Sequence, residues 1–188
     1  MATKIYIDQG HNPVNPNAGA EGNGLREQDI VFRIGILLAE LFRENPAFEV
    51  RLSRPTLEVQ LGTSNTTSLR ERVRLANEWG ADYFISLHTN ASSQSSATGV
   101  EAFAFSKPSV AFDLGSDIIK NISALTGLRN RGMQTRSGLY VLRKTVMPSV
   151  LVELGFITNP NDASLMVNEP ELFAQGVYDG TLEYLNLN

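Results

Sequence analysis

Short apolar runs alternate with helical segments along the whole chain, and this alternation constrains the fold more than any other feature. The apolar runs predict strands over 5–7, 48–52, 82–87, 99–105, 139–142 and 150–152. Apolar residues spaced three and four apart predict helices over 27–44, 68–79, 108–125 and 170–185. Strands that alternate with helices favour parallel pairing, because each helix forms the crossover between two strands. We therefore predict one α/β domain over residues 1–188, a layered sandwich with a mostly parallel twisted sheet and helices on both faces.

Local patterns mark some of the predicted boundaries. Ser68 with Glu71 three residues later is typical of a capping box, which places a helix start at Ser68. Gly127 stands where a helix C-terminal cap belongs. The segment 9–24 is rich in Gly, Asn and Pro, so we expect a loop there.

Composition excludes several classes of protein. A chain of 188 residues that is 42% hydrophobic is long enough for one buried core and short for two. The net charge of −4 and the pI near 5.2 argue against a nucleic-acid partner. With no cysteine, the chain offers neither a disulfide nor a thiolate metal site. No apolar run is long enough to span a bilayer, and no secretory signal precedes the first strand, so we expect no membrane insertion.

Two histidines, His11 and His88, are the only imidazoles in the sequence, and each stands just past the end of a predicted strand. Glu153 follows the run 150–152 in the same way. Open α/β sheets bind ligands beyond the carboxyl ends of their strands, so these three groups are expected at one edge. Glu27 begins the first helix, which starts on the side where the first strand ended. Two imidazoles and two carboxylates are therefore expected to converge.

Two histidines, one carboxylate and a water molecule form a recognised catalytic zinc set. Zinc lowers the pKa of its water towards about 7 and polarises a carbonyl oxygen. The second carboxylate can then take a proton from that water and pass it to a departing amine. The four residues together predict a zinc-dependent hydrolase.

Four ordered segments carry a family resemblance: Ile7-Asp8-Gln9-Gly10-His11-Asn12, Gly24-Leu25-Arg26-Glu27, residues 81–91 (ADYFISLHTNA) and residues 148–159 (PSVLVELGFITN). They resemble the zinc-dependent N-acetylmuramoyl-L-alanine amidases of the type 3 amidase family, and the similarity covers nearly the whole chain. The resemblance implies that His11, Glu27 and His88 bind zinc and that Glu153 is the catalytic glutamate. It also implies the substrate, which is the peptidoglycan amide between the lactyl group of N-acetylmuramic acid and L-alanine. The family usually has proline in place of Gln9 and often glycine in place of Asn12, so we expect the turn before His11 to differ locally.

Weaker candidates flank this set. Arg131 and Arg136 belong to a basic stretch that either lines a groove for stem-peptide carboxylates or forms a solvated loop. Asn90 either bonds substrate or holds its own loop through an Asx turn. Asp8 is expected to brace the turn after the first strand rather than bind metal. Glu101 alternates with apolar residues and is expected to face solvent.

Three functions remain open on the sequence alone. The first is a peptidoglycan-cleaving amidase that acts in the cell wall or another extracytoplasmic space. The second is a non-catalytic wall-binding or regulatory module, which would have no chemical need for Glu153. The third is another zinc hydrolase, such as a peptidase or deacylase, with the same donor set.

Overall fold

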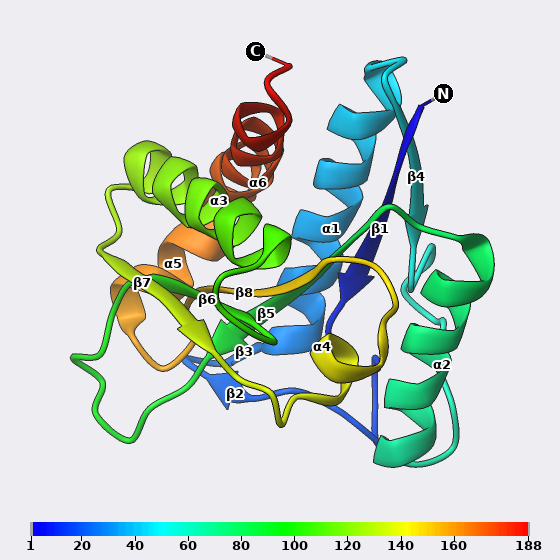
Figure 1. Cartoon of the computed structure of the whole chain (residues 1–188). Helices are drawn as coiled ribbons and strands as arrows, with labels where there is room; N and C mark the ends of the chain where they lie inside the picture. Colours follow the sequence, from blue (N-terminus) through cyan, green and yellow to red (C-terminus); the bar gives the residue numbers. More distant parts are fainter. Residues whose placement is uncertain (1, 188) are drawn as a thin grey trace.

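A six-stranded sheet forms the centre of the molecule in the computed structural model, which describes residues 2–187 (Figure 1). Its strands are β1 (Thr3–Gln9), β4 (Phe48–Leu52), β5 (Tyr83–Asn90), β6 (Val100–Ala104), β7 (Asn130–Thr135) and β8 (Ser149–Phe156). Their spatial order is β4-β1-β5-β8-β6-β7. Neighbours from β4 to β8 pair in parallel, β6 is antiparallel to β8, and β7 is parallel to β6. The prediction of a mostly parallel α/β sandwich is therefore confirmed.

Three long helices cover one face of this sheet: α1 (Glu27–Glu44), α3 (Val110–Thr126) and α6 (Pro170–Leu185) (Figure 1). They bury alternate aliphatic side chains of the strands, including Ile7, Leu87 and Val152, none of which is exposed. A shorter helix, α5 (Pro160–Asn168), lies beside β8 and α6. A small separate ribbon, β2 (Glu21–Gly22) with β3 (Leu25–Arg26), leads into α1. This face holds the larger hydrophobic core, which fixes where the strands end.

The opposite face is covered over only part of its width. Helix α2 (Asn65–Trp79) and the single-turn helix α4 (Tyr140–Lys144) pack there on a second core that includes Phe84, Phe103 and Leu151. Towards the β7 edge the same face is open, and Gln134 and Arg136 are exposed. We call the part of this face formed by β6 and β7 the shelf. Helices thus lie on both faces, as expected, but the shelf is left accessible.

Two helix assignments from the sequence are wrong. Residues 139–142 begin the helix α4 and not a strand, because Arg143 and Thr145 donate backbone hydrogen bonds to carbonyls four residues earlier. A short apolar run cannot distinguish a buried strand from one buried helical turn. The capping residue of α2 is Ser64, whose side chain accepts from the Thr67 amide. Ser68 lies inside the first turn, because the same spacing of capping residues occurs twice in this stretch.

Other elements were missed or misplaced. Strand β7 lies where a basic loop was expected, because an exposed edge strand lacks the apolar alternation that would reveal it. Helix α5 starts after Asn159, which caps it, and it is too short to show a clear period. Glu101 is wrongly expected at the surface, since only 5% of it is exposed. No helix among residues 2–187 is long and apolar enough to cross a membrane.

Candidate metal centre

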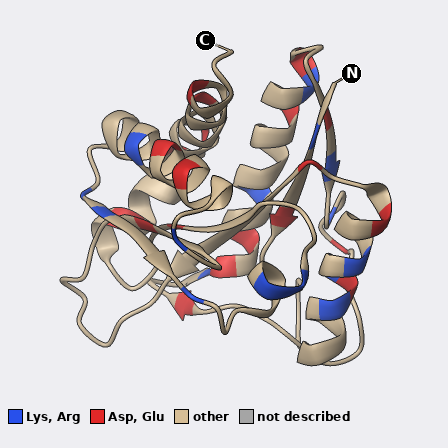
Figure 2. Ribbon diagram, viewed as in Figure 1, with Lys and Arg blue, Asp and Glu red and all other residues tan. Residues whose placement is uncertain are grey.

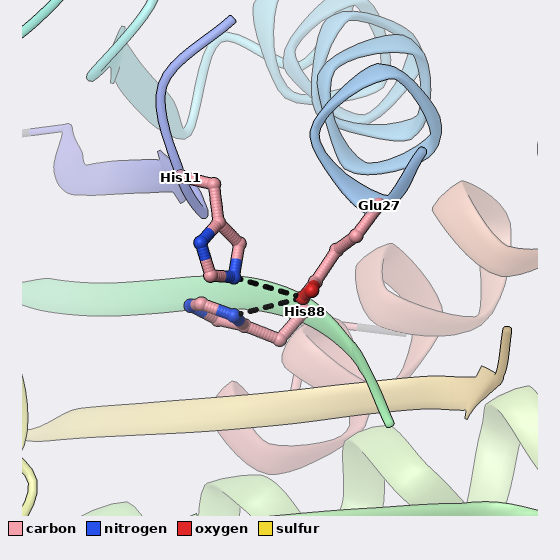
Figure 3. A group of neighbouring side chains, drawn as sticks. All are labelled: His11, Glu27 and His88. Carbon is pink, nitrogen blue, oxygen red and sulfur yellow. Dashed lines mark hydrogen bonds and ion pairs between the residues drawn. The ribbon is translucent and has the colours of Figure 1, made fainter. Parts of the chain in front are cut away.

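The structure brings His11, Glu27 and His88 together at the carboxyl end of the parallel strands (Figure 3). One carboxylate oxygen, Oε1 of Glu27, lies 3.1 Å from His11 Nε2 and 3.1 Å from His88 Nδ1. One donor atom from each residue lies within 4.8 Å of the other two. The two imidazole rings meet edge to face, with centroids 4.8 Å apart. The predicted convergence of the two histidines with Glu27 is therefore observed.

Glu27 is the first residue of α1, and its carboxylate is held by backbone amides on both sides. Oε2 accepts from the Ala20 amide at 2.8 Å, and Oε1 accepts from the Thr89 amide at 2.9 Å. The side chain is buried, and among the described residues its ion-pair partners are the two histidines alone. A buried carboxylate without an arginine or lysine partner suits a bound cation.

The backbone at His11 is also restrained. His11 has a φ of 65°, which is uncommon for a residue other than glycine. Its carbonyl oxygen accepts from Nη1 of Arg54 at 3.1 Å and from Nη2 of Arg72. The two guanidinium groups therefore hold the peptide in the one orientation that points the imidazole at Glu27.

Arg72 is in turn paired with Asp8, which accepts from its Nη1 at 2.6 Å and from Ser86 Oγ at 2.8 Å. Burial alone would raise the pKa of Asp8, but the charge of Arg72 and these hydrogen bonds hold it below its usual value. Asp8 braces the turn before His11, as predicted. Burial and the nearby charge of Arg72 lower the pKa of Arg54 to about 10.

The two departures from the family pattern have structural roles in this turn. The Gln9 amide donates to Ser53 Oγ, and its side-chain oxygen accepts from the Arg54 amide. Asn12 is fully buried and exchanges hydrogen bonds with the backbone of Leu61. Proline could not make the first contact, because it has no backbone N–H.

Charges inside the site favour an ionised carboxylate next to a proton or a metal cation. Burial would raise the pKa of Glu27, but hydrogen bonds and charge from both histidines hold it far below its usual range. Burial would lower the pKa of His88, yet its hydrogen bond to Glu27 raises it. Two imidazoles and a carboxylate fit a divalent metal, which would displace the proton on His88 when it binds.

Glu153 lies next to this set in β8. It is the direct partner of His88 in β5 and of Glu101 in β6, so the three side chains project to one face of the sheet. Burial raises the pKa of Glu153 to about 7, with His88 opposing the shift and Glu27 and Glu101 adding to it. Its Oε2 is buried and has no hydrogen-bond partner among the described residues. Glu153 can therefore exchange a proton near neutral pH.

Two glycines make room for the ligands, and sequence reasoning missed both. A Cβ on Gly10 would lie 2.5 Å from Cε1 of His88 and 2.7 Å from the Leu87 carbonyl oxygen. A Cβ on Gly19 would lie 2.8 Å from Oε2 of Glu27. Both stand in a loop crowded with small residues, where no sequence pattern distinguishes them. Arg54 and Arg72 were missed for a similar reason, because their contact with His11 is purely tertiary.

The Gly10→Ala variant is expected to weaken metal binding by about 10- to 100-fold, the range typical for disturbed support of a metal ligand. The added methyl group must displace either the His88 ring or the backbone of β5. Metal affinity can be measured by competition with a chromophoric chelator. Gly138→Ala is the matched control, since a Cβ there meets nothing within 4 Å. Equal affinities for the two variants would contradict this account.

The weaker candidates lie along the shelf. Arg136 stacks over the Phe103 ring at 4.3 Å, and Arg131 stacks over Phe156 at 5.1 Å. Figure 2 shows basic residues at both ends of β7 and on α4. The Asn90 amide donates to Glu101 Oε1 at 2.5 Å, and its oxygen accepts from the Ala91 amide. Both arginines are exposed beside the centre, whereas the Asn90 amide is engaged within the chain.

Comparison with known proteins points to one family. The family model described as N-acetylmuramoyl-L-alanine amidase matches residues 5–183. The N-acetylmuramoyl-L-alanine amidase CwlM of Bacillus licheniformis is 34% identical, over 98% of this chain and 70% of its own length. LytC, an N-acetylmuramoyl-L-alanine amidase of Bacillus subtilis (strain 168), is 36% identical over 96% of this chain, which spans 35% of that relative.

Solved structures agree with the sequence relatives. The catalytic domain of CwlV, an N-acetylmuramoyl-L-alanine amidase from Bacillus (Paenibacillus) polymyxa var. colistinus, superposes with a TM-score of 0.86 at 29% identity and 99% coverage of both chains. The CwlD amidase from Clostridioides difficile, solved in complex with the GerS lipoprotein, gives a TM-score of 0.90 at 26% identity, covering 99% of this chain and 100% of that one. With its family match over nearly all residues and its similarity to these amidases, the chain belongs to the N-acetylmuramoyl-L-alanine amidase family.

Proposed function

We propose that residues 1–188 form one catalytic domain that hydrolyses, with zinc, the peptidoglycan amide between N-acetylmuramic acid and L-alanine. The observation that carries the proposal is the cluster of His11, Glu27 and His88 with Glu153 beside it on the same sheet face. Names of the relatives support an action on the cell wall, in the wall or another extracytoplasmic space.

The proposed zinc ligands are His11, Glu27 and His88, which leave a coordination position for water. When bound, zinc lowers the pKa of water and polarises the carbonyl oxygen of the scissile amide. The chain supplies the rest of the site. The amides of Ala20 and Thr89 fix the Glu27 carboxylate, and the two buried arginines fix the His11 backbone.

Glu153 is proposed as the general base and then as the general acid. Its unpartnered Oε2 takes a proton from the attacking water and delivers it to the nitrogen of the departing L-alanine. The pKa of about 7 suits both steps, because proton transfer is most efficient when the pKa lies near the working pH. A module that only binds the wall would gain nothing from this free carboxylate.

The shelf is proposed to receive the stem peptide. Glu153 must reach the leaving nitrogen, so the amine side of the scissile bond lies towards β8 and β6. The exposed guanidinium groups of Arg131 and Arg136 then lie where they can pair with peptide carboxylates. Asn90 borders the same region and is proposed to contact substrate while holding Glu101.

Metal removal tests the proposed function. Purified protein incubated with muropeptides is expected to release free L-alanine amino termini, to stop after chelation, and to resume when zinc is added back. Amino termini are quantified by derivatisation and mass spectrometry, and bound zinc by elemental analysis. Cleavage at another amide would favour a different zinc hydrolase. Wall binding without cleavage would favour a non-catalytic module, and absence of zinc after reconstitution would contradict the ligand assignment.

A further inference from the structure

A small pocket of about 130 Å³ adjoins the two histidines on the side away from the shelf. His11 and His88 form one wall. Leu69 of α2, residues 139–141 at the start of α4 and Leu151 of β8 form the rest of the lining that faces them. The volume equals that of roughly four water molecules at about 30 Å³ each, so it accepts only a small chemical group.

The chemistry of the lining selects an apolar group. The walls on α2, α4 and β8 are mainly aliphatic, with Leu69, Leu139, Val141 and Leu151. The charged pair at the pocket, Asp8 and Arg72, is buried, and the two side chains bond each other at 2.6 Å. That pair therefore has little remaining capacity to recognise a polar ligand, and the aliphatic wall offers dispersion contacts instead.

The strand order fixes which side of the scissile amide faces this pocket. His11 follows β1, His88 lies in β5 and Glu153 lies in β8, in the spatial order β1-β5-β8. Because Glu153 must protonate the leaving nitrogen, the amine side extends over β8 and the shelf. The acyl side then extends over β5 and β1, where the pocket lies between the histidines and α2.

We infer, resting on the proposed function, that this pocket is the subsite for the lactyl methyl group on the acyl side of the scissile amide. The methyl is the small apolar substituent next to the reacting carbonyl. The pocket would thus distinguish a lactyl amide from a glycolyl amide, which has hydrogen in place of that methyl.

Three muropeptides test the assignment: the native amide, its glycolyl analogue, and an analogue with glycine in place of L-alanine. The wild-type protein loaded with zinc is expected to prefer lactyl over glycolyl by about fourfold in kcat/KM. Burial of one methyl-sized group, about 0.8 kcal/mol, gives that ratio. Leu69→Phe fills the pocket and is expected to bring the ratio to about one, mainly by raising KM for the lactyl amide, with zinc content unchanged.

Leu75→Phe is the matched control, because Leu75 is also a half-buried leucine of α2 but does not line the pocket. This variant should keep the wild-type ratio. A Leu69→Phe ratio equal to that of the wild type would overturn the assignment. So would loss of the preference for L-alanine over glycine in place of the lactyl preference, since the pocket would then hold the amine side.

A second variant covers the case in which Leu69→Phe does not fold. Leu69→Ala enlarges the pocket and is expected to improve cleavage of an amide with an ethyl group in place of the lactyl methyl, relative to the native amide. No relative gain would overturn the subsite. Failure of the wild type to cleave any of these amides would instead overturn the proposed function and the subsite with it, a result distinct from lost discrimination.

Discussion

The Glu153→Gln variant is expected to lower kcat for cleavage of the muramyl amide by about 100- to 10,000-fold, the usual contribution of a positioned acid or base. Glutamine keeps the shape of the side chain but cannot take a proton from water. The free Oε2 and the pKa near 7 both depend on the carboxyl group. Zinc content should stay at the wild-type level, because Glu153 is not one of the proposed ligands.

Glu101→Gln is the matched control for this measurement. Glu101 is the neighbour of Glu153 across β6 and β8, but its two oxygens already accept from Asn90 and Gln134. A smaller loss of kcat than in Glu153→Gln is expected. Steady-state kinetics on one muropeptide, with zinc measured on the same preparations, separates the two carboxylates. An activity of Glu153→Gln within threefold of the wild type would rule out the assigned role.

The Asp8→Ala variant is expected to lower the free energy of unfolding by about 3–5 kcal/mol, the range for removing one partner of a buried ion pair. Asp8 and Arg72 are each only 1% exposed. Without the carboxylate, the guanidinium group stays buried beside that of Arg54 with carbonyl oxygens as its main acceptors. Denaturant unfolding monitored by circular dichroism measures the change, and zinc affinity should fall as well because Arg72 holds the His11 peptide.

The effect should depend on pH with a defined sign. Since the pKa of Asp8 is lower in the folded protein than in the unfolded chain, its stabilisation is fully present above the usual aspartate pKa. It is lost as the pH falls through the folded value, so wild type and variant should converge in acid. Glu78→Ala, which removes a partner of Arg74 in an exposed ion pair, should cost far less at neutral pH. Similar losses in the two variants would contradict the role of burial.

The metal ligands could be predicted because strand ends are local and the sheet collects them. Each histidine adjoins an apolar run, and a parallel sheet places such positions at one edge. Glu101 could not be predicted, since its burial depends on β7, an edge strand without an apolar pattern. Arg54 and Arg72 contact His11 across 43 and 61 residues, and no periodicity encodes such contacts. Helix α4 was taken for a strand because one buried turn and one buried strand share the same apolar letters.

The open shelf has a consequence for the size of molecule that can be cut. A site enclosed by helices on every side would admit only the free end of a chain. Here the reacting residues lie beside an exposed strand pair, so a long substrate can lie across β6 and β7 and continue beyond the edge of the protein in either direction. For the proposed reaction, an amide in the interior of a cross-linked network is therefore as accessible as one on a released fragment.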